Sequence, residues 1–554
     1  MNHQVNNRCR RMASMYGQFD CPVCSAGQAV VSSAWRMEKI TYASLSALGE
    51  DFHQAFQGAL AYEQKKLGRT HSLFIRGQKK KAKAGSFTDT SPSDTRVNLG
   101  EFQSAGREET REAIKAARSA VPVWIELGWR QRVAFLRKAA EIMTERQFRI
   151  AALLSLEVGK NRSEAIAEVS ESIDLILYYC RQMEIHHGYE LAMGGSGCEN
   201  TRSVLKPYGV WAVVSPFNFP LALAAGMASG ALITGNTIVF KPASDTPLAG
   251  FVLYEILHEA GLPVGVVNFI TGPGKTVGEE LITNPDVDGF IFTGSRLVGL
   301  DIARRFNQPR LRPCITEMGG KNPAIVMPSA NLEDASEGVL RSAFGMGGQK
   351  CSACSRLYLH QKVYKPFMEL LVEKTKKLVI GDPIKRDTFL GPLINDSAVV
   401  NYDTAIRLGK KDGRLVQGGS RLKGDSFAHG FFVEPAIIER APASSSLFRD
   451  EYFAPVLAVA EIKSLEEAIT LANDSEYGLT AGIFSQEEHE QEAFFDAIQA
   501  GVTYSNRRGG ATTGAWPGVQ SFGGWKHSGS SGKSALGPYY VAQFLREQSQ
   551  TRIK

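Results

Sequence analysis

Residues 209–240, with the sequence GVWAVVSPFNFPLALAAGMASGALITGNTIVF, form the longest stretch of the chain without a charged side chain. Its length would suit a membrane span, but Pro216, Asn218, Pro220 and Asn236 interrupt the apolar run. Prolines and polar residues at such positions are typical of turns between buried elements. We therefore expect a buried strand, a turn and a helix here rather than a bilayer span.

The sequence on either side continues this pattern. Short apolar runs alternate with segments of helix length, and the runs lie at 210–214, 237–240, 266–270 and 289–292. Alternating strands and helices predict a parallel sheet with crossover helices. Each run leads into a turn rich in Gly, Pro, Ser or Thr, namely SPFNFP, KPASDTP, TGPGKTVG and FTGSRLVG. Since ligands of open α/β sheets bind outside the carboxyl ends of the strands, these turns predict one dinucleotide-sized site.

Helices and a second alternating region flank this sheet. Apolar residues recur at helical spacing in 108–121 and again in 131–154, which predicts two amphipathic helices. A second alternating region extends from about residue 322 to 519. The chain shows no internal repeat and no low-complexity linker.

Composition indicates an ordinary globular protein of enzyme size. The chain has 554 residues, of which 43% are hydrophobic and 22% charged, with a formal net charge of +6. The densest basic run, RGQKKKAK at 76–83, is expected to be a solvated loop or strand edge, with a nucleic-acid patch as the less favoured reading. Eight cysteines without regular spacing argue against a disulfide framework and for a reducing compartment. We expect no nucleic-acid partner, no membrane partner and no metal site.

The first 36 residues differ from the rest because they are rich in arginine and nearly free of acidic residues. They could be a transit-like extension, or a small metal-binding tag formed by Cys9, Cys21 and Cys24. The reading that we favour is an upstream start, with Met37 opening the protein itself. The expected location is cytoplasmic, or the mitochondrial matrix if the segment is a transit peptide.

Three sites carry possible chemistry, each with an ordinary structural alternative. The turn from Gly272 to Gly278 has the spacing G-x-G-x-x-x-G, which fits a phosphate site and a structural turn about equally. Lys241 follows an apolar strand and could hold ribose hydroxyls, although a surface lysine is the simpler reading. Glu317 beside two glycines suits a general base, with helix capping as the alternative.

Cys351 lies in GGQKCSACSR, residues 347–356. A metal site would need two more ligands, and the other CxxC is far upstream at Cys21. A redox pair would be expected near the start of a small βαβ unit. The glycine pair instead predicts the beginning of a helix, where the helix dipole and Lys350 would stabilise a thiolate. We therefore predict Cys351 as a nucleophile and Cys354 as a packing residue.

The motifs PFNFP, KPASDTP, FTGS, EMGGKNP, GGQKCSACSR, EYFAPV and SFGGWKHSG occur in the order typical of the aldehyde dehydrogenase superfamily, which the chain resembles. The resemblance extends from about residue 70 to 545. It implies an α/β fold with a Rossmann-like NAD domain, an α/β catalytic domain and a small β oligomerisation element. The implied divisions are an N-terminal helical extension at 37–69, the NAD-binding domain at 70–185 and 208–318, the oligomerisation strands at 186–207 and 530–554, and the catalytic domain at 319–529.

Within the superfamily the chain most resembles the subgroup that oxidises L-glutamate γ-semialdehyde, derived from 1-pyrroline-5-carboxylate, to L-glutamate in proline degradation. The cues are QKCSACSR, FTGSRLVG and the region from Tyr504 to Gly524. The resemblance implies that Cys351 forms a thiohemiacetal and then a thioester, and that Glu317 activates water for hydrolysis. It also implies that the Asn218 amide and the Cys351 backbone N–H stabilise the oxyanion.

Cofactor and substrate contacts follow from the same resemblance. Lys241 would bind the adenosine ribose, Ser295 a phosphate and Glu451 the nicotinamide ribose, and the turn with Gly274 and Gly278 would lie near the phosphates. Ser244 stands where members strict for NAD often have glutamate, so NAD is expected and NADP stays open. The implied substrate contacts are Ser352 and the backbone amides of Gly514 and Ala515 for the carboxylate, and Phe219 and Phe522 for the methylene chain.

Two departures from the family pattern concern substrate affinity: Ser521 replaces a proline and His527 replaces a glycine. The enzymatic alternative is a dehydrogenase of another semialdehyde or of an aliphatic aldehyde. The alternative of another class is a non-catalytic scaffold, against which the joint presence of Cys351, Glu317 and Asn218 argues. An acylating dehydrogenase would be expected to lack Glu317. Self-association as a dimer or a higher oligomer is also expected.

Overall fold

The computed structural model describes residues 49–195, 198–308, 310–510 and 515–553. These residues belong to one compact unit. The expectations for residues 1–36, for the first part of the helical extension and for Gly514 lie outside the described residues. The described part of the extension is α2 (Glu50–Gln64), an amphipathic helix whose Phe52, Phe56 and Leu60 are buried.

The first large sheet contains the strands predicted from the four apolar runs. They are β8 (Val210–Val214), β9 (Thr237–Lys241), β10 (Val267–Phe269) and β11 (Gly289–Thr293), and β12 (Cys314–Glu317) follows β11. These five strands pair in parallel with one another. The prediction of a parallel sheet is therefore confirmed for this region.

The strand order places a crevice at the carboxyl end of β8. The order in the sheet is β12-β11-β8-β9-β10-β2-β3. The chain moves outward from β8 through β9 to β10, then returns to the other side of β8 with β11 and β12. Where the direction of winding reverses in this way, the loops on the two sides diverge and leave a crevice for a ligand. The turns that follow β8, β9 and β11 therefore lie around one crevice.

The stretch 209–240 folds as expected. β8 is followed by the turn at 215–221, by α7 (Ala222–Ile233) and by β9. Nearly every residue of α7 is buried, which explains why this helix lacks a polar face. Among the described residues, no helix combines the length and the apolar composition that crossing a membrane requires.

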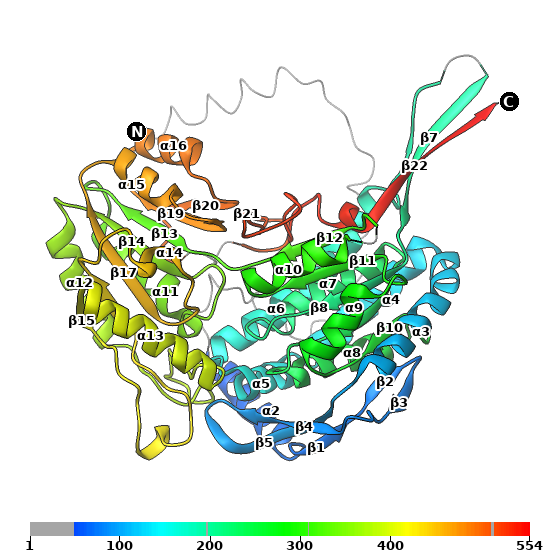
Figure 1. The fold of residues 1–554 in the computed structure, drawn as a ribbon, viewed down its shortest axis with the longest axis horizontal. Coiled ribbons are helices and arrows are strands. Elements are labelled where there is room, and N and C mark those ends of the chain that lie inside the picture. Colours follow the sequence, from blue (N-terminus) through cyan, green and yellow to red (C-terminus); the bar gives the residue numbers. More distant parts are fainter. Residues whose placement is uncertain (1–48, 196–197, 309, 511–514, 554) are drawn as a thin grey trace. The chain divides into compact units, whose positions relative to one another are not determined.

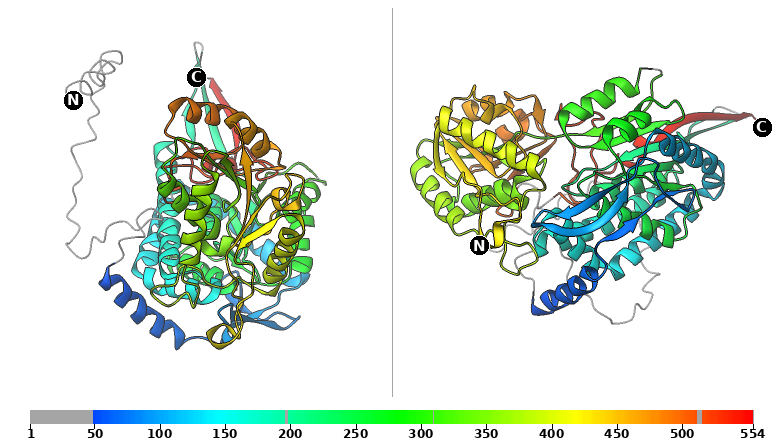
Figure 2. Two further views of the ribbon diagram at one scale, coloured as in Figure 1. Left: turned by 90° about the vertical axis from the view of Figure 1, so that its left-hand side faces the viewer. Right: turned by 60° about the horizontal axis from the view of Figure 1, so that its bottom comes forward.

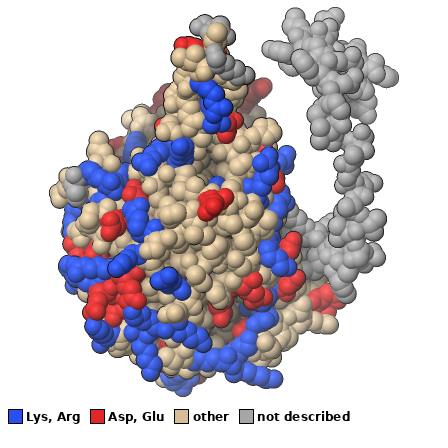
Figure 3. All heavy atoms as spheres, turned by 90° about the vertical axis from the view of Figure 1, so that its right-hand side faces the viewer, with Lys and Arg blue, Asp and Glu red and all other residues tan. Residues whose placement is uncertain are grey.

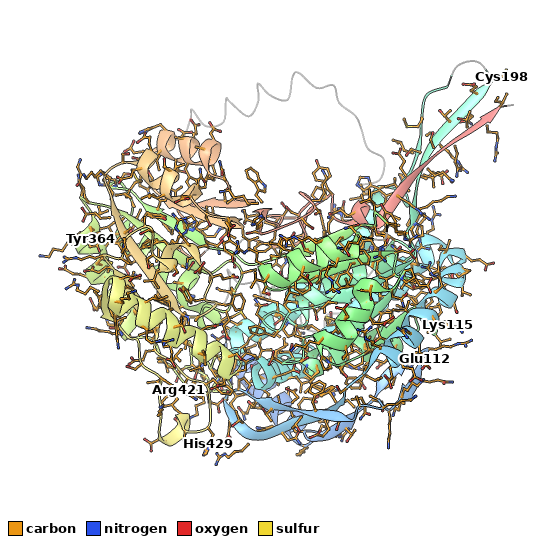
Figure 4. All side chains as sticks on the ribbon, viewed as in Figure 1. Glu112, Lys115, Cys198, Tyr364, Arg421 and His429 are labelled. Atoms are coloured by element: carbon orange, nitrogen blue, oxygen red, sulfur yellow. The ribbon has the colours of Figure 1, made fainter. Side chains whose placement is uncertain are left out.

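The basic run at 76–83 forms the outer edge of the first sheet. β2 (Leu73–Ile75) pairs antiparallel with β10, and β3 (Gln78–Lys80) is the edge strand. Lys80 forms an ion pair with Glu112, which Figure 4 labels on α3 (Arg107–Glu126). Charged side chains on an edge strand discourage pairing with a second sheet.

The first predicted helix is longer than expected. The pattern predicted 108–121, but α3 continues past Pro122 to Glu126. Burial of Trp124, whose indole N–H donates to the Leu232 carbonyl at 3.0 Å, accompanies this extension. Tertiary packing therefore offsets the loss of the backbone donor at the proline.

The second predicted helix, 131–154, is wrong as a single element. The structure has α4 (Gly128–Glu145) and α5 (Gln147–Val158), separated at Arg146, whose φ of −105° and ψ of 10° are not helical. The Arg146 N–H donates to carbonyls of the last turn of α4. No glycine or proline marks this break, so the apolar periodicity carried no sign of it.

A tight joint connects α5 to α6 (Arg162–Ile185). Gly159 has a φ of +83°, and a β-carbon there would lie 2.8 Å from the Pro392 ring. Asn161 caps α6 by accepting the Glu164 N–H at 2.9 Å. These constraints hold Lys160, between Gly159 and Asn161, in one place.

The second large sheet is mainly parallel and has the order β15-β16-β17-β14-β13-β19-β20. Its central strands are β13 (Asn322–Val326), β14 (Cys354–His360), β17 (Val456–Ile462) and β19 (Thr480–Phe484), with β20 (Val502–Ser505) at one edge. Figure 1 shows the two large sheets side by side. The alternating pattern predicted for 322–519 is therefore present, whereas the domain boundaries drawn from it stay a prediction.

The chain ends in a small sheet that projects from the other elements. Its strands are β22 (Leu545–Ile553), β7 (Glu199–Pro207) and β6 (Glu190–Ala192), all paired antiparallel. Both views of Figure 2 show β7 and β22 extending beyond the rest of the described chain, and Figure 4 labels Cys198 near the tip. We call β6, β7 and β22 the projecting sheet.

The remaining described helices and strands complete the two large layers and the N-terminal region. They are β1 (Arg69–His71), β4 (Ser86–Ser91), β5 (Asp94–Gln103), α8 (Pro247–Glu259), α9 (Glu279–Thr283), α10 (Arg296–Phe306), α11 (Leu332–Phe344), α12 (Tyr364–Lys376), α13 (Asp396–Asp412), β15 (Arg414–Gln417), β16 (Ala436–Glu439), α14 (Ser446–Arg449), α15 (Leu465–Asn473), β18 (Tyr477–Gly478), α16 (Glu488–Ala497) and β21 (Trp525–Lys526).

Candidate active site

Cys351 lies in a turn that precedes β14. A short 3-10 helix, Gly345–Gly348, leads into it, and Met346, Gly347 and Gly348 have φ values of 54°, 63° and 66°. A β-carbon on Gly348 would lie 2.5 Å from the Ala454 carbonyl oxygen, so only glycine fits. Glycine adopts the left-handed region readily, so of these three residues only Met346 is strained, and such strain persists where the surrounding structure enforces it. We call residues 345–353 the nucleophile turn.

The expectation that Cys351 starts a helix is wrong. The chain passes from Cys351 through a turn into strand β14, so Cys351 does not lie at the N-terminus of a helix. Burial lowers the pKa of the Lys350 ammonium, and the largest opposing effect is that of the Glu164 carboxylate. The main charged partner of the Lys350 ammonium is therefore the Glu164 carboxylate on α6. Cys354 packs in the core with 2% of its surface exposed, as expected.

The surroundings of Cys351 favour the neutral thiol in this state of the protein. Burial raises the pKa of the Cys351 thiol to about 12, and the carboxylates of Glu451 and Glu317 raise it as well. The two acids belong to different segments that converge on the sulfur. The Cys351 thiol and the two carboxylates therefore lie close together. Groups with strongly shifted pKa values cluster in this way at the active sites of enzymes.

Asn218 joins this site from the first sheet. It lies in the turn after β8, is 4% exposed, and its Nδ2 donates to the Gln349 carbonyl oxygen at 3.0 Å. One hydrogen of the Asn218 amide is used in this bond to the nucleophile turn. The amide group has a second hydrogen, which points in another direction. The geometry thus fixes the amide plane beside Cys351.

Gln349 and Asn322 hold the nucleophile turn from two sides. The Gln349 side-chain oxygen accepts the Ile394 N–H at 2.9 Å. Asn322 Nδ2 donates to the Cys351 carbonyl at 2.7 Å and to the Ala353 carbonyl at 3.0 Å. Sequence reasoning did not single out either residue. The available signal was a polar amide inside each of two otherwise glycine-rich motifs, GGQKC and EMGGKNP.

Glu317 lies at the carboxyl end of β12. Burial raises the pKa of its carboxyl to about 8, and a hydrogen bond from the Gly524 backbone N–H opposes this rise. Its Oε2 is enclosed and has no hydrogen-bond partner among the described residues. A carboxyl with a pKa near neutrality and an unused oxygen can take up a proton from a nearby water or thiol.

Glu451 approaches the same region from the segment before β17. Its Oε1 accepts the Gly320 N–H at 2.9 Å, and a β-carbon on Gly319 would overlap its carboxylate. Burial raises the pKa of the Glu451 carboxyl to about 7. Gly319 is therefore required because a carboxylate packs directly on its backbone, and Gly320 because a β-carbon there would overlap the Cys351 carbonyl oxygen.

The predicted cofactor residues lie at the ends of neighbouring strands. Lys241 ends β9, and its Nζ donates to the Pro242 carbonyl at 3.1 Å. Burial lowers the pKa of the Lys241 ammonium to about 8. Ser244 is exposed in the same turn, and positions for a β-carbon on Gly274 and Gly278 face open space.

Ser295 provides a further test of whether a dinucleotide fits. It is the N-cap residue of α10, yet its hydroxyl makes no capping hydrogen bond. The first amides of this helix and the serine hydroxyl are therefore suited to a phosphate. With the Lys241 ammonium and the Glu451 carboxylate as partners for ribose hydroxyls, the residues present fit a dinucleotide.

The apolar side chains of Leu297 and Val298 on the first turn of α10 are 76% and 48% exposed. They lie next to Ser295 and were not predicted as site residues. An exposed leucine is common on surfaces, so no local signal singled them out.

The predicted substrate residues lie on separate segments, and Ser352 and Phe219 each directly follow a candidate catalytic residue. Ser352 is 2% exposed in the nucleophile turn, and Phe219 follows Asn218 directly. The Phe219 ring lies 3.7 Å from the Lys160 Nζ, measured to the ring centroid. Phe522 pairs with Ala535 through a backbone hydrogen bond of 2.8 Å, and Ala515 is buried.

Comparison with known proteins gives a consistent result. The profile of the aldehyde dehydrogenase family matches residues 79–549. The 1-pyrroline-5-carboxylate dehydrogenase 1 of Halalkalibacterium halodurans is 37% identical over 90% of this chain and 96% of that protein. The 1-pyrroline-5-carboxylate dehydrogenase 2 of Bacillus subtilis is 37% identical over 90% of this chain and 95% of that protein.

Among solved structures, 1-pyrroline-5-carboxylate dehydrogenase from Thermus with bound NAD superposes with a TM-score of 0.88. The two sequences are 34% identical, and the alignment covers 95% of this chain and 100% of that one. The similarity therefore includes both large sheets rather than one region alone.

Proposed function

The chain belongs to the aldehyde dehydrogenase family, and we propose that it oxidises L-glutamate γ-semialdehyde, the open form of 1-pyrroline-5-carboxylate, to L-glutamate with NAD. The observation that carries this proposal is the meeting of Cys351, Glu317 and Asn218 in one site. Identity of 37% with named 1-pyrroline-5-carboxylate dehydrogenases over 90% of the chain supports the choice of substrate.

In the proposed reaction the Cys351 sulfur forms a bond to the aldehyde carbon, and the carbonyl oxygen becomes an oxyanion. The free hydrogen of the Asn218 amide and the Cys351 backbone N–H donate to that oxygen. One such donor typically contributes about 3 kcal/mol to the transition state. Because burial raises the pKa of the Cys351 thiol to about 12, the thiol must release its proton to solvent before the sulfur bonds to the carbon, which leaves Glu317 ionised for the hydrolysis step.

Lys241, Ser295 and Glu451 would hold NAD through its ribose hydroxyls and phosphates. When bound, NAD supplies the two-electron redox chemistry of the reaction. The chain holds the thiohemiacetal carbon in place through Cys351 and Asn218 while this step occurs.

Hydrolysis of the Cys351 thioester requires an activated water. The ionised Glu317 takes a proton from that water, and its unpartnered Oε2 is the atom available for the purpose. The same oxyanion donors stabilise the second tetrahedral intermediate. Glutamate then leaves and the thiol is restored.

The pH dependence of hydrolysis follows from this role. A general base acts only when it is ionised, and burial raises the pKa of Glu317 to about 8. We expect the hydrolysis rate to rise as pH increases, with a midpoint near 8, and to level off above it. Steady-state kcat at saturating substrates, measured from about pH 6 to about pH 10, checks this expectation. A kcat that stays constant across this range would contradict it.

The substrate end of the proposal rests on Ser352, Ala515, Phe219 and Phe522. Consecutive backbone amides with a serine hydroxyl can hold a carboxylate, and two phenylalanine rings can pack on a short methylene chain. A substrate with a terminal α-amino acid group and two methylenes matches this combination.

A substrate panel tests the proposal. Purified protein is assayed with glutamate γ-semialdehyde, succinate semialdehyde and propanal, each with NAD and with NADP. We expect the highest kcat/KM for glutamate γ-semialdehyde with NAD. A higher kcat/KM for either other aldehyde would overturn the substrate assignment, and activity with none of them would overturn the enzymatic function.

We also propose that two copies of the chain associate through the projecting sheet. Leu191 and Ile553 on this sheet are 64% and 72% exposed, and Met193, which follows β6, is 52% exposed. The face drawn in Figure 3, below the projecting sheet, is largely uncharged in its middle. Exposed apolar side chains grouped like these three mark an interaction site, and β22, the edge strand of this sheet, offers unpaired backbone groups.

Replacing Leu191 with Asp is expected to weaken self-association. Burial of one leucine contributes about 2 kcal/mol, which corresponds to roughly 30-fold in the dissociation constant. Light scattering across a dilution series measures this change. The matched control is Leu311→Asp, since Leu311 is 91% exposed and lies outside the projecting sheet. Equal masses for the two variants at every concentration would contradict the proposal.

A further inference from the structure

We propose that Lys160 and Glu168, a buried ion pair outside the reacting groups, are positioning residues that set the preference for the glutamate-like chain by orienting Phe219. This inference rests on the proposed function and extends it to residues that touch neither the aldehyde nor the cofactor. We call the residues 215–221, which carry Asn218 and Phe219, the oxyanion turn.

The pair is enclosed and closely matched. The side chains of Lys160 and Glu168 are 1% and 0% exposed, and Lys160 Nζ lies 2.5 Å from Glu168 Oε2. Lys160 occupies the joint between α5 and α6, where Gly159 and Asn161 fix the backbone on both sides. The backbone of Lys160 is therefore held in place, and its buried side chain reaches Glu168 and Phe219 from a fixed point.

The pair contacts the oxyanion turn at two points. Lys160 Nζ lies over the Phe219 ring, 3.7 Å from its centroid. The second oxygen of Glu168 accepts the N–H groups of Leu221 at 2.9 Å and Ala222 at 3.1 Å, where α7 begins. One contact holds a side chain of the turn, and the other holds the backbone at its end.

Asn218 connects the oxyanion turn to the nucleophile turn. Its amide donates to the Gln349 carbonyl oxygen at 3.0 Å. One contact thus holds Asn218, another holds Phe219, and a third holds the backbone at the end of the oxyanion turn. Because the Asn218 contact does not involve the ion pair, loss of the pair is expected to affect Phe219 more than Asn218.

The ammonium also determines how a substrate meets Phe219. A desolvated cation is strongly attracted to the face of an aromatic ring, so one face of Phe219 is covered. A methylene chain must pack against another side of the ring, in the orientation that Lys160 imposes. Propanal has a shorter chain and depends less on this contact.

Stability alone does not explain the presence of this buried ion pair. Two buried charges lose their hydration, and an apolar pair of equal volume often serves stability as well or better. Removing one partner alone leaves an uncompensated charge and can prevent folding.

The test therefore replaces both residues together, with Lys160→Met and Glu168→Gln in one protein. The introduced glutamine keeps an oxygen for the two backbone donors, so α7 remains capped.

The double variant is expected to raise KM for glutamate γ-semialdehyde about tenfold, a change of the size that a desolvated cation–π contact supplies. We expect kcat to stay within about threefold of wild type and KM for propanal to be unchanged, because Asn218 and Cys351 keep their contacts. The surface pair Lys377→Met with Glu373→Gln is the matched control, as its partners lie 2.6 Å apart and are exposed.

A second measurement separates orientation of the ring from general packing. Phe219→Leu is introduced into wild type and into the double variant. If Lys160 acts through the ring, its removal has no further effect on KM for glutamate γ-semialdehyde once the ring is absent. Additive effects of the two changes would overturn the inference, as would equal changes in KM for both aldehydes. Failure of the wild-type protein to oxidise glutamate γ-semialdehyde would instead overturn the proposed function, and the inference with it.

Discussion

Replacing Cys351 with alanine is expected to abolish aldehyde oxidation and to lower kcat by more than about 10⁴-fold, as removal of a covalent nucleophile does in other enzymes. The sulfur is the atom to which the substrate carbon bonds, and the described neighbours of Cys351 offer no second nucleophile at the same place. Steady-state assays at saturating glutamate γ-semialdehyde and NAD measure the loss.

Cys354 supplies the control for this experiment. It has the same side chain and lies three positions along, but it is buried in the core at the start of β14. Cys354→Ala is expected to change kcat by less than about threefold while lowering stability by about 1 kcal/mol, since it only leaves a small cavity. A Cys351→Ala protein that is folded and retains more than a tenth of wild-type kcat would refute the nucleophile assignment.

Replacing Glu317 with glutamine is expected to separate acylation from hydrolysis. The amide cannot accept a proton from water, so the thioester should accumulate after one turnover. We expect kcat to fall by about 10²- to 10⁴-fold, the range typical of a lost general base. Stopped-flow recording of reduced cofactor should show a rapid burst in proportion to enzyme, followed by a slow phase.

Glu157 is the matched control for Glu317. Burial raises the pKa of its carboxyl to about 8 as well, but its oxygens accept the N–H groups of Leu248 and Ala249 at the start of α8. Glu157→Gln keeps an acceptor for these donors. We expect its steady-state rate of cofactor reduction to equal that of wild type. A Glu317→Gln protein without a burst and with wild-type kcat would exclude Glu317 as the base.

Much of the fold could be predicted because it depends on local pattern. The apolar runs at 210–214, 237–240 and 289–292 gave strands at nearly the observed bounds, since a buried parallel strand needs a continuous apolar run. The break at Arg146 and the extension of α3 past Pro122 were not predictable in this way. Both depend on what the helices pack against rather than on their own periodicity.

Some features of the candidate site could likewise be predicted from the sequence, and others could not. Residue type and motif order indicated Cys351, Glu317 and Asn218, and the structure brings all three together, although their roles stay proposals. The environment of Cys351 was predicted wrongly, because GGQKC leads into a strand and not a helix. Local sequence indicated a turn after the glycines but not the direction in which the chain leaves it.

By itself, the sequence determined the two α/β sheets, the family and the residue types available for chemistry, because these follow from periodicity and from short motifs. Only the tertiary structure decided the states of those residues. The high pKa of the Cys351 thiol arises from burial and from the carboxylates of Glu451 and Glu317, and the position of Phe219 from Lys160 and Glu168. Each of these effects depends on burial and on distances between residues far apart in the chain, which no local pattern encodes.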